Sequence, residues 1–346
     1  MLTAKENMRE CIKGGNPDRF VNQYEAMQLV INPSFMASPS PKRGELDVKN
    51  AWGVYNSWPS HVPGPFPDHA PDKILIKDIE EWQSYVTPPS LDLPDELWNV
   101  CQDMMDKVDG NLSYKAVFVA PGLFEQTHHF CSMTEALVNY MEYPDEMHDL
   151  IKMLTDWEME LAEKICDRLH PDMLFHHDDW GTERNSFMDP DLWADFFVEP
   201  YKQIYGYYHD HGVEFVVHHS DSYCANLVDG MIEMGIDVWQ GCMRTNKVDE
   251  LLKKYKGKIT FMGNIDNKQV DFDGWTTEDC KKAADLALDG FPTTGYIPCI
   301  TQGGPGSVYP GTYAELTKYI DEWNCEKFGC TQADIEANRM PLQIMF

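Results

Sequence analysis

Ionisable side chains directly follow several apolar runs of this sequence, and His219 and Asp221 are the clearest pair. They come at the end of the run 213–217, VEFVV, just before a helical pattern begins. Residues two apart in an extended segment point to the same side, so both side chains can reach one ion or one substrate atom. An imidazole and a carboxylate suit zinc, which for catalysis needs a third ligand and an open position. The alternative interpretation is a hydrogen-bonded His–Asp pair at the end of a strand.

A second ionisable group follows the apolar run 172–175 and consists of His176, His177, Asp178 and Asp179. Adjacent carboxylates repel each other when both are buried and charged, so one of them is expected to have a raised pKa or a cationic partner. We interpret His177, Asp178 and Asp179 as candidates for acid–base catalysis. Capping of a helix by an aspartate is the alternative, and it accounts for only one of the two carboxylates.

A third candidate is Glu125, which lies four residues before His129 in a helical pattern and so shares a face with it. A role in the site competes here with an ordinary surface or capping pair. The glycine-rich loop 302–306 lacks the Lys-Ser/Thr ending of a Walker phosphate loop. The sequence also lacks the G-x-S-x-G elbow, the H-E-x-x-H helix and a G-x-G-x-x-G turn after a first strand. The absence of these motifs argues against a serine hydrolase, a zincin or a nicotinamide dehydrogenase.

Apolar runs and helical patterns alternate from residue 114 onward. Strands are expected at 114–120, 172–175, 213–217, 236–239, 258–262 and 296–300, and helices at 123–141, 144–169, 190–211, 223–234, 247–255, 277–289 and 311–326. This alternation indicates an α/β protein with a parallel sheet covered by helices. The length favours one (β/α)8 TIM barrel domain over 1–346, with an open doubly wound sheet as the alternative. In a barrel, the polar residues after each strand meet at the active-site face.

The first 110 residues differ from the rest, with N-terminal helices expected at 2–13, at 22–31 and within 77–108. Between them lies the segment 32–72, which is irregular and rich in Pro and Trp. Structureless loops of this length are usually functional or disordered, and the many aromatic residues argue against disorder. We therefore expect the segment 32–72 to form a rim over a pocket.

The net charge of −29 restricts the partners of this protein. A polyanion is repelled by nucleic acid and by anionic membrane surfaces, so neither is expected as a partner. The ten cysteines form no C-x-x-C pair, and the N-terminus has no apolar signal core. Reduced thiols and a cytoplasmic location are therefore expected. No stretch is apolar and long enough to cross a membrane.

Taken together, the motifs resemble the uroporphyrinogen decarboxylase-like superfamily over residues 16–326. The resemblance rests on Phe124-Glu125, Asp178-Asp179-Trp180-Gly181-Thr182, His219-x-Asp221, Gly263-Asn264-Ile265-Asp266 and Gly303-Gly304. It implies a (β/α)8 barrel of the uroporphyrinogen decarboxylase type, with its site at the carboxyl ends of the strands. True decarboxylases carry an arginine-rich N-terminal stretch, whereas the segment 16–24 contains only Arg19. Decarboxylation by a lyase of this type is therefore kept as the alternative.

The other branch of the superfamily contains corrinoid-dependent methyltransferases of anaerobes. Members that act on thiols hold zinc with a His-x-Cys pair and a later cysteine. Here the pair aligns with His219-x-Asp221, and no cysteine lies near Gly303–Gly304. A site of nitrogen and oxygen ligands is similar to that of the O-demethylase methyltransferases I of acetogens and related anaerobes. The resemblance thus implies methyl transfer from a methoxylated aromatic compound to the Co(I) corrinoid of a partner protein.

This resemblance gives each candidate a role. A phenolate leaving group needs a proton or a Lewis acid, and zinc held by His219 and Asp221 provides the latter. The expected acid–base catalysts are His177, Asp178 and Asp179. The expected substrate-binding residues are Trp180, Tyr223, Trp239, Tyr309 and Glu125. Quaternary amines, methanol and glycine betaine are alternative methyl donors, and a non-catalytic binding protein on a barrel scaffold is the third hypothesis.

Overall fold

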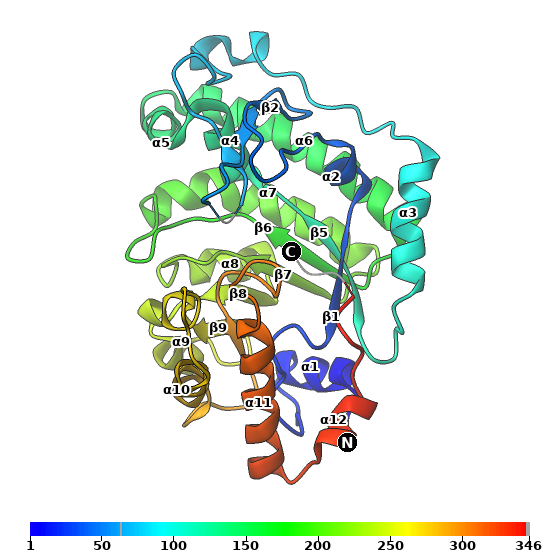
Figure 1. The fold of residues 1–346 in the computed structure, drawn as a ribbon. Coiled ribbons are helices and arrows are strands. Elements are labelled where there is room, and N and C mark those ends of the chain that lie inside the picture. The colour runs from blue at the N-terminus through cyan, green and yellow to red at the C-terminus, as the bar shows by residue number, and fades with distance from the viewer. Residues whose placement is uncertain (63, 344–346) are drawn as a thin grey trace.

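Seven parallel strands form the centre of the molecule, in the order β1-β5-β6-β7-β8-β9-β10. The computed structural model describes residues 1–62 and 64–343. The strands are β1 (Met27–Ile31), β5 (Tyr114–Val119), β6 (Met173–His177), β7 (Phe215–His219), β8 (Val238–Cys242), β9 (Thr260–Ile265) and β10 (Tyr296–Ile300). The sheet curls, and helices cover its outside (Figure 1). This confirms the predicted α/β barrel, whose central sheet has seven strands in the described part of the chain.

The segment before β1 bridges the two edges of the curled sheet. The Gln23 backbone N–H donates to the carbonyl of Pro298 on β10 at 3.2 Å, and the Gln23 side-chain oxygen accepts from the Ile300 N–H at 3.3 Å. Residues 22–31 were expected to be helical, and that prediction is wrong. They contain β1, which is nearly all buried.

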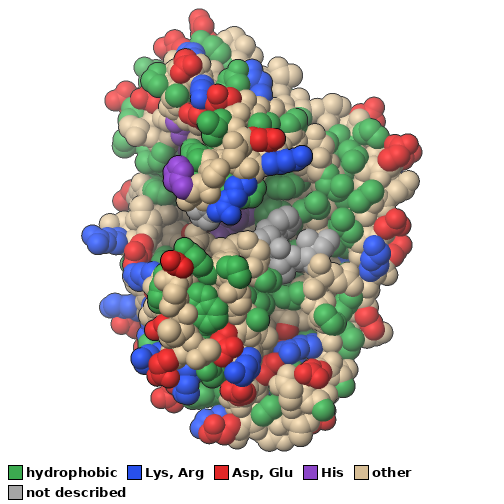
Figure 2. All heavy atoms as spheres, viewed as in Figure 1, with side chains coloured by type: hydrophobic (Ala, Val, Ile, Leu, Met, Phe, Trp, Pro, Cys, Tyr) green, Lys and Arg blue, Asp and Glu red, His purple; other side chains and the backbone are tan. Residues whose placement is uncertain are grey.

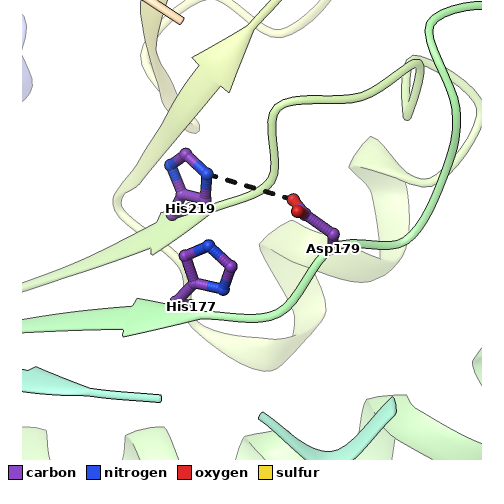
Figure 3. Close-up of side chains that lie close together, drawn as sticks. All are labelled: His177, Asp179 and His219. Carbon is purple, nitrogen blue, oxygen red and sulfur yellow. Dashed lines mark ion pairs between the residues drawn. The ribbon is translucent and has the colours of Figure 1, made fainter. Parts of the chain in front are cut away.

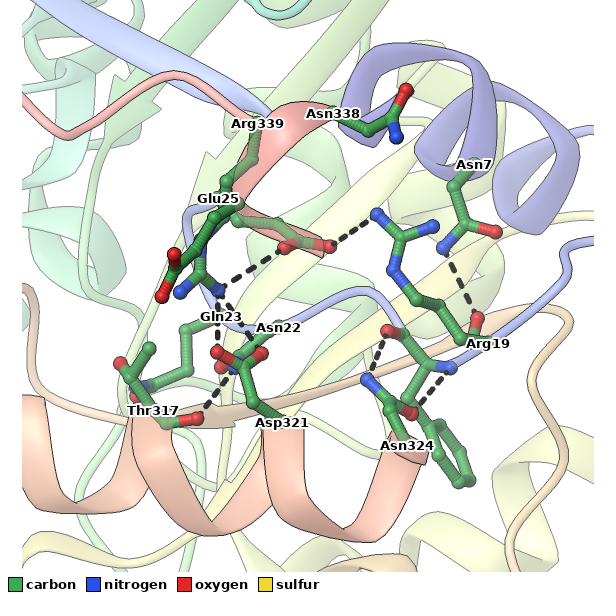
Figure 4. A network of polar contacts seen from close by, with 12 residues as sticks. Asn7, Arg19, Asn22, Gln23, Glu25, Thr317, Asp321, Asn324, Asn338 and Arg339 are labelled. Atoms are coloured by element: carbon green, nitrogen blue, oxygen red, sulfur yellow. Dashed lines mark hydrogen bonds and ion pairs between the residues drawn. The ribbon is translucent and has the colours of Figure 1, made fainter. Parts of the chain in front are cut away.

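A buried polar network holds this closure in place (Figure 4). The Glu25 carboxylate lies between two guanidinium groups, 3.6 Å from Arg19 and 3.7 Å from Arg339. Arg339 also pairs with Asp321 of the last long helix at 2.8 Å. Breaking a buried charge pair leaves an uncompensated charge, so the network firmly ties the start of the chain to its end.

Twelve α-helices lie in the described part of the chain. They are α1 (Ala4–Ile12), α2 (Pro33–Ala37), α3 (Asp95–Asp106), α4 (Leu123–Cys131), α5 (Met133–Glu142), α6 (Pro144–Leu169), α7 (Pro190–Asp210), α8 (Val228–Met234), α9 (Val248–Lys254), α10 (Thr277–Leu288), α11 (Thr312–Phe328) and α12 (Gln332–Ala337). Local sequence sets several of their starts. Thr3 and Glu6 form a capping box on α1, and Asp189 caps α7 just before Pro190.

The predicted helix 123–141 is two helices, because the chain turns sharply at Ser132. Ser132 has φ +87° and its hydroxyl accepts from the Glu135 N–H, so it starts α5 directly after α4 ends. A single serine among the other polar residues of this helical pattern does not predict such a break. The turn leaves α4 as a short helix that follows β5 in the chain, and this is the helix that reaches the candidate site.

The segment 32–72 lies over the carboxyl ends of the strands, beside α4 (Figure 1). It contains α2 and a small antiparallel sheet of β2 (Val48–Lys49), β3 (Tyr55–Ser57) and β4 (Phe66–Pro67). Trp52 packs edge-on against Phe130 of α4, with ring centroids 5.6 Å apart. In Figure 2 the surface is hollowed near its middle, below this segment. None of the described helices combines the length and the apolar character that a membrane crossing requires.

Candidate functional site

Two histidines end neighbouring strands and lie side by side. His177 ends β6 and His219 ends β7, and the two are partners in the sheet register. Their rings stack with centroids 4.4 Å apart and an interplanar angle of 17°. His176 and His218 point the other way, toward α6 and α7, where they contact Glu158 and Tyr205. The strand alternation therefore separates two histidines of the site from two structural ones.

Asp179 completes a cluster with these two histidines (Figure 3). One ligand atom from each of His177, Asp179 and His219 lies within 4.8 Å of the others, and His219 Nε2 is 4.0 Å from Asp179 Oδ1. Zinc binds imidazole nitrogen and carboxylate oxygen, and three protein ligands leave an open position. The donor types of this cluster thus fit a catalytic zinc ion.

Partners of the two imidazoles fix which nitrogen faces the cluster. Glu125 Oε2 accepts from His177 Nδ1 at 2.8 Å. Gln240 Nε2 donates to the carbonyls of Ile300 and Thr301, both at 3.3 Å, so its Oε1 is the acceptor for His219 Nδ1. In both rings Nδ1 then carries the hydrogen, and Nε2 is left for a metal ion. Carboxylate and amide partners of this kind orient metal-binding histidines.

The pKa values of the two histidines are shifted in opposite directions. Burial alone would lower the pKa of His177, but the Glu125 carboxylate outweighs it and raises that pKa to about 10. Burial and the neighbouring His177 charge lower the pKa of His219 to about 4. At neutral pH without metal, His177 is therefore an imidazolium paired with Glu125, and His219 is neutral. The Glu125–His177 contact was not expected from the sequence, which paired Glu125 with His129.

Asp221, predicted as a metal ligand, lies beside the cluster rather than in it. Its backbone N–H donates to Asp179 Oδ1 at 3.0 Å, so the main chain at Asp221 lies against the Asp179 carboxylate. Burial and the Asp179 charge raise the pKa of Asp221 to about 8. The carboxylate closest to His177 and His219 is thus that of Asp179, which the sequence assigned to acid–base catalysis. The chain bends after each strand, and two-residue alternation does not describe that bend.

Asp178 points away from the cluster and holds α4. Its side chain is fully buried and accepts four hydrogen bonds. The donors are the N–H groups of Phe124 (3.1 Å) and Glu125 (2.8 Å), Trp180 Nε1 (2.9 Å) and the Tyr201 hydroxyl (2.6 Å). Burial, supported by the Glu125 charge, raises the pKa of Asp178 to about 7. This placement matches the helix-capping alternative for one of the two adjacent aspartates.

The structure does not bring the predicted aromatic residues together at the cluster. Trp180 is buried and stacks on His218, with ring centroids 4.0 Å apart. Trp239 is also buried, and its Nε1 donates to the Ser220 carbonyl at 2.9 Å. Tyr309 is exposed on the loop after β10, and Tyr223 is half-buried beside Thr182. Their predicted contact with a substrate ring gains no support from these positions.

Sequence reasoning missed two groups near the site. Gln240 sits on β8 opposite His219 in the register, and only the three-dimensional pairing reveals it. His69 of the segment 32–72 packs against His128 of α4, with ring centroids 6.4 Å apart. The adjacent pair His128-His129 was a visible signal, but nothing in the sequence linked it to His69.

Comparison with known proteins gives a family and a fold. The model of the family described as uroporphyrinogen decarboxylase (URO-D) matches residues 127–323. A solved structure described as a methyltransferase from Methanosarcina mazei is similar with a TM-score of 0.65 and 14% identity. That likeness covers 93% of this chain and 99% of the other, and at this identity it shows the fold alone. No curated protein matches the sequence.

A second solved structure is less similar. It is described as a modular endo-beta-1,4-mannanase from Cellulomonas fimi, with 12% identity and a TM-score of 0.42. The likeness covers 92% of this chain and 74% of the other. It is too weak to support any argument about this protein.

Proposed function

The chain belongs to the uroporphyrinogen decarboxylase (URO-D) family, and we propose that it is a corrinoid-dependent methyltransferase of that family. It transfers a methyl group from a methoxylated aromatic compound to the Co(I) corrinoid of a partner protein, and so acts as an O-demethylase component. The observation that carries this proposal is the cluster of His177, Asp179 and His219 at the ends of two neighbouring barrel strands. Its donors are nitrogen and oxygen, and a metal ion held by them can stabilise an oxygen leaving group.

The residues of the site divide the work between them. His177, Asp179 and His219 would hold zinc, and the ion supplies Lewis-acid stabilisation of the phenolate oxygen when bound. Glu125 and Gln240 keep the Nε2 atoms of the two imidazoles directed at the cluster. Such partners matter because ligand orientation and basicity depend on the hydrogen bond at the other ring nitrogen.

The choice of an ether over a thiol follows from the ligand set. Methyltransferases that act on thiols use thiolate ligands, as the motif resemblance implies, and this cluster contains no cysteine. Three cysteines on or next to the barrel strands, Cys224, Cys242 and Cys299, are completely buried. Burial raises the pKa of each thiol, so none is a ready source of thiolate.

The direct test combines metal analysis with a methyl-transfer assay. Purified protein should contain about one zinc per chain, and a reduced corrinoid protein should gain a methyl–Co(III) spectrum with a methoxybenzoate. His219→Ala should lose both, whereas His148→Gln, a change at an exposed histidine of α6, should lose neither. If a panel of aryl ethers, methanol, glycine betaine and methanethiol yields no methyl–Co(III), the proposal is wrong. Transfer from methanethiol alone would refute the ether.

A metal-free lyase is the second candidate, because His177 carries a proton. Decarboxylation leaves a carbanion that must be protonated, and an imidazolium with a pKa of about 10 is a competent acid. The net charge of −29 disfavours a substrate with many carboxylates. Release of CO2 from a porphyrinogen-like acid by chelator-treated protein would favour this candidate over methyl transfer.

A further inference from the structure

Helix α4 continues past Glu125 with two more ionisable side chains. His128 and His129 lie one turn beyond Glu125 and so extend the face that reaches His177. Their rings meet edge to face, with centroids 4.8 Å apart, and His69 approaches His128 from the segment 32–72. Three imidazoles from two separate segments therefore gather on this side of α4, close enough for Asp179 to act on the pKa of His128 and for His177 to act on that of His129.

Two nitrogens of this group have no hydrogen-bond partner. His69 Nε2 and His128 Nδ1 are buried and unpaired. Buried polar atoms are nearly always paired, and an unpaired one calls for an explanation such as a bound water, ion or ligand group. Both belong to one ring contact between α4 and the segment 32–72. A ligand oxygen at this contact would supply the missing partner.

These histidines are neutral at pH 7, which limits what they can bind. Burial lowers the pKa of His128 to about 4 and lowers the pKa of His69 and His129 as well. A neutral imidazole offers one N–H and one lone pair, so it can both donate to and accept from a hydroxyl group. A carboxylate offers no hydrogen, and it would meet the nearby charge of Asp179, which acts on the pKa of His128.

We propose that His69 and His128 form a specificity site for a hydroxyl group on the aromatic ring of the methyl donor. This inference rests on the proposed function and adds a requirement to it: the methoxylated ring carries a free hydroxyl. The hydroxyl fills the unpaired positions on His69 and His128, and this directs the methoxy group toward the His177–Asp179–His219 cluster. His129, the third imidazole, lies on the same helix face.

The test compares two probes that differ only in the hydroxyl group, 2-methoxyphenol and methoxybenzene. Calorimetric titration of the zinc-loaded protein needs no corrinoid, so it measures recognition apart from methyl transfer. A site built to hydrogen-bond a hydroxyl rejects the analogue that lacks it, because its own polar groups are then left unpaired. We expect 2-methoxyphenol to bind about 10- to 100-fold more tightly than methoxybenzene.

Variants assign this preference to the two histidines. His128→Leu and, independently, His69→Leu should reduce the ratio of the two dissociation constants to within about threefold. His128→Gln keeps a donor and an acceptor and should restore most of the preference, whereas a purely structural role would not distinguish the probes. The exposed control His148→Gln should keep the full ratio.

The outcomes separate the two proposals. Equal binding of both probes to the unaltered protein, or an undiminished ratio in both leucine variants, overturns the specificity site. Methyl transfer from methoxybenzene at the same rate as from 2-methoxyphenol also overturns it, while the proposed function stands. If no methyl donor of the panel yields methyl–Co(III) but the binding ratio holds and follows the variants, the methyl-transfer function fails and the hydroxyl site remains.

Discussion

Replacing Asp178 with alanine tests whether this residue holds the fold rather than the chemistry. The substitution removes the acceptor of four hydrogen bonds, two from backbone N–H groups of α4 and one each from Trp180 and Tyr201. Hydrogen bonds to a charged group contribute about 1.5–3 kcal/mol each, so the gross loss is about 6 kcal/mol or more. Burial of the carboxylate is costly, as its pKa of about 7 indicates, and its removal returns part of that loss. We expect a net decrease of about 4 kcal/mol in the free energy of unfolding.

The assay is urea denaturation at pH 7, followed by tryptophan fluorescence and circular dichroism. Asp189→Ala provides the matched control, because Asp189 also caps a helix but accepts a single backbone hydrogen bond, from Asp191 at 2.9 Å. That change should cost only about 1 kcal/mol. Asp178→Asn is the intermediate case: its amide oxygen keeps some of the four donors paired, so its loss should fall between the two alanine variants.

The reasoning is refuted if Asp178→Ala is no less stable than Asp189→Ala. The same holds if Asp178→Asn keeps full stability but loses methyl transfer completely, since that pattern belongs to a residue that contacts the substrate. A large loss of stability together with a reduced zinc content in the folded fraction supports the geometry. The carboxylate holds α4, and α4 carries the partner of a metal ligand.

Three further changes probe the same region and the base of the barrel. Glu125→Gln should lower the pKa of His177, because burial then outweighs the remaining charges. Zinc binding to the unaltered protein at pH 7 should release about one proton, and binding to this variant should release fewer. Calorimetry in buffers of different ionisation enthalpy measures the number of protons released. Burial alone would raise the pKa of Glu214, but hydrogen bonds from Arg9 and Lys13 lower this pKa to about 2. The pKa of a glutamate in the unfolded chain is about 4.3. The ionised Glu214 therefore stabilises the folded protein fully above that pH, and this contribution is lost as the pH falls toward 2. Glu214→Gln should therefore destabilise the protein by about 1 kcal/mol at pH 7 and hardly at pH 2; an equal effect at both pH values contradicts this. Gly122→Ala would place a Cβ 2.5 Å from the Asp178 Cβ and should cost about 2 kcal/mol in urea denaturation, whereas an unchanged midpoint would show that this contact is loose.

The barrel was predictable because its later strands and helices alternate clearly. Each strand from β5 onward is a short apolar run followed by polar residues, and the predicted runs overlap the observed strands. The first strand was missed for a physical reason. A strand that is buried on both faces has no polar alternation, so β1 cannot be told from a buried helix by its periodicity. Only pairing with β5, far along the chain, defines it.

The candidate site was predictable in its parts but not in its assembly. The sequence named His177, Asp178 and Asp179 as acid–base candidates and His219 as a metal ligand, and the structure brings three of these four together, without Asp178. The sequence paired His219 with Asp221 because both follow one strand. Which carboxylate comes closest depends on how the chain bends after β6 and β7, and local periodicity carries no information on that bend.

The three consecutive residues His177, Asp178 and Asp179 link the fold to the site. His177 and Asp179 point into the cluster, whereas Asp178 points backward to the N-terminus of α4. That helix returns Glu125 to the ring nitrogen of His177. Hydrogen bonds thus connect the end of β6 to α4 twice, through Asp178 and through His177. A cluster supported in this way keeps its geometry without metal, which is the preorganisation that a catalytic site requires.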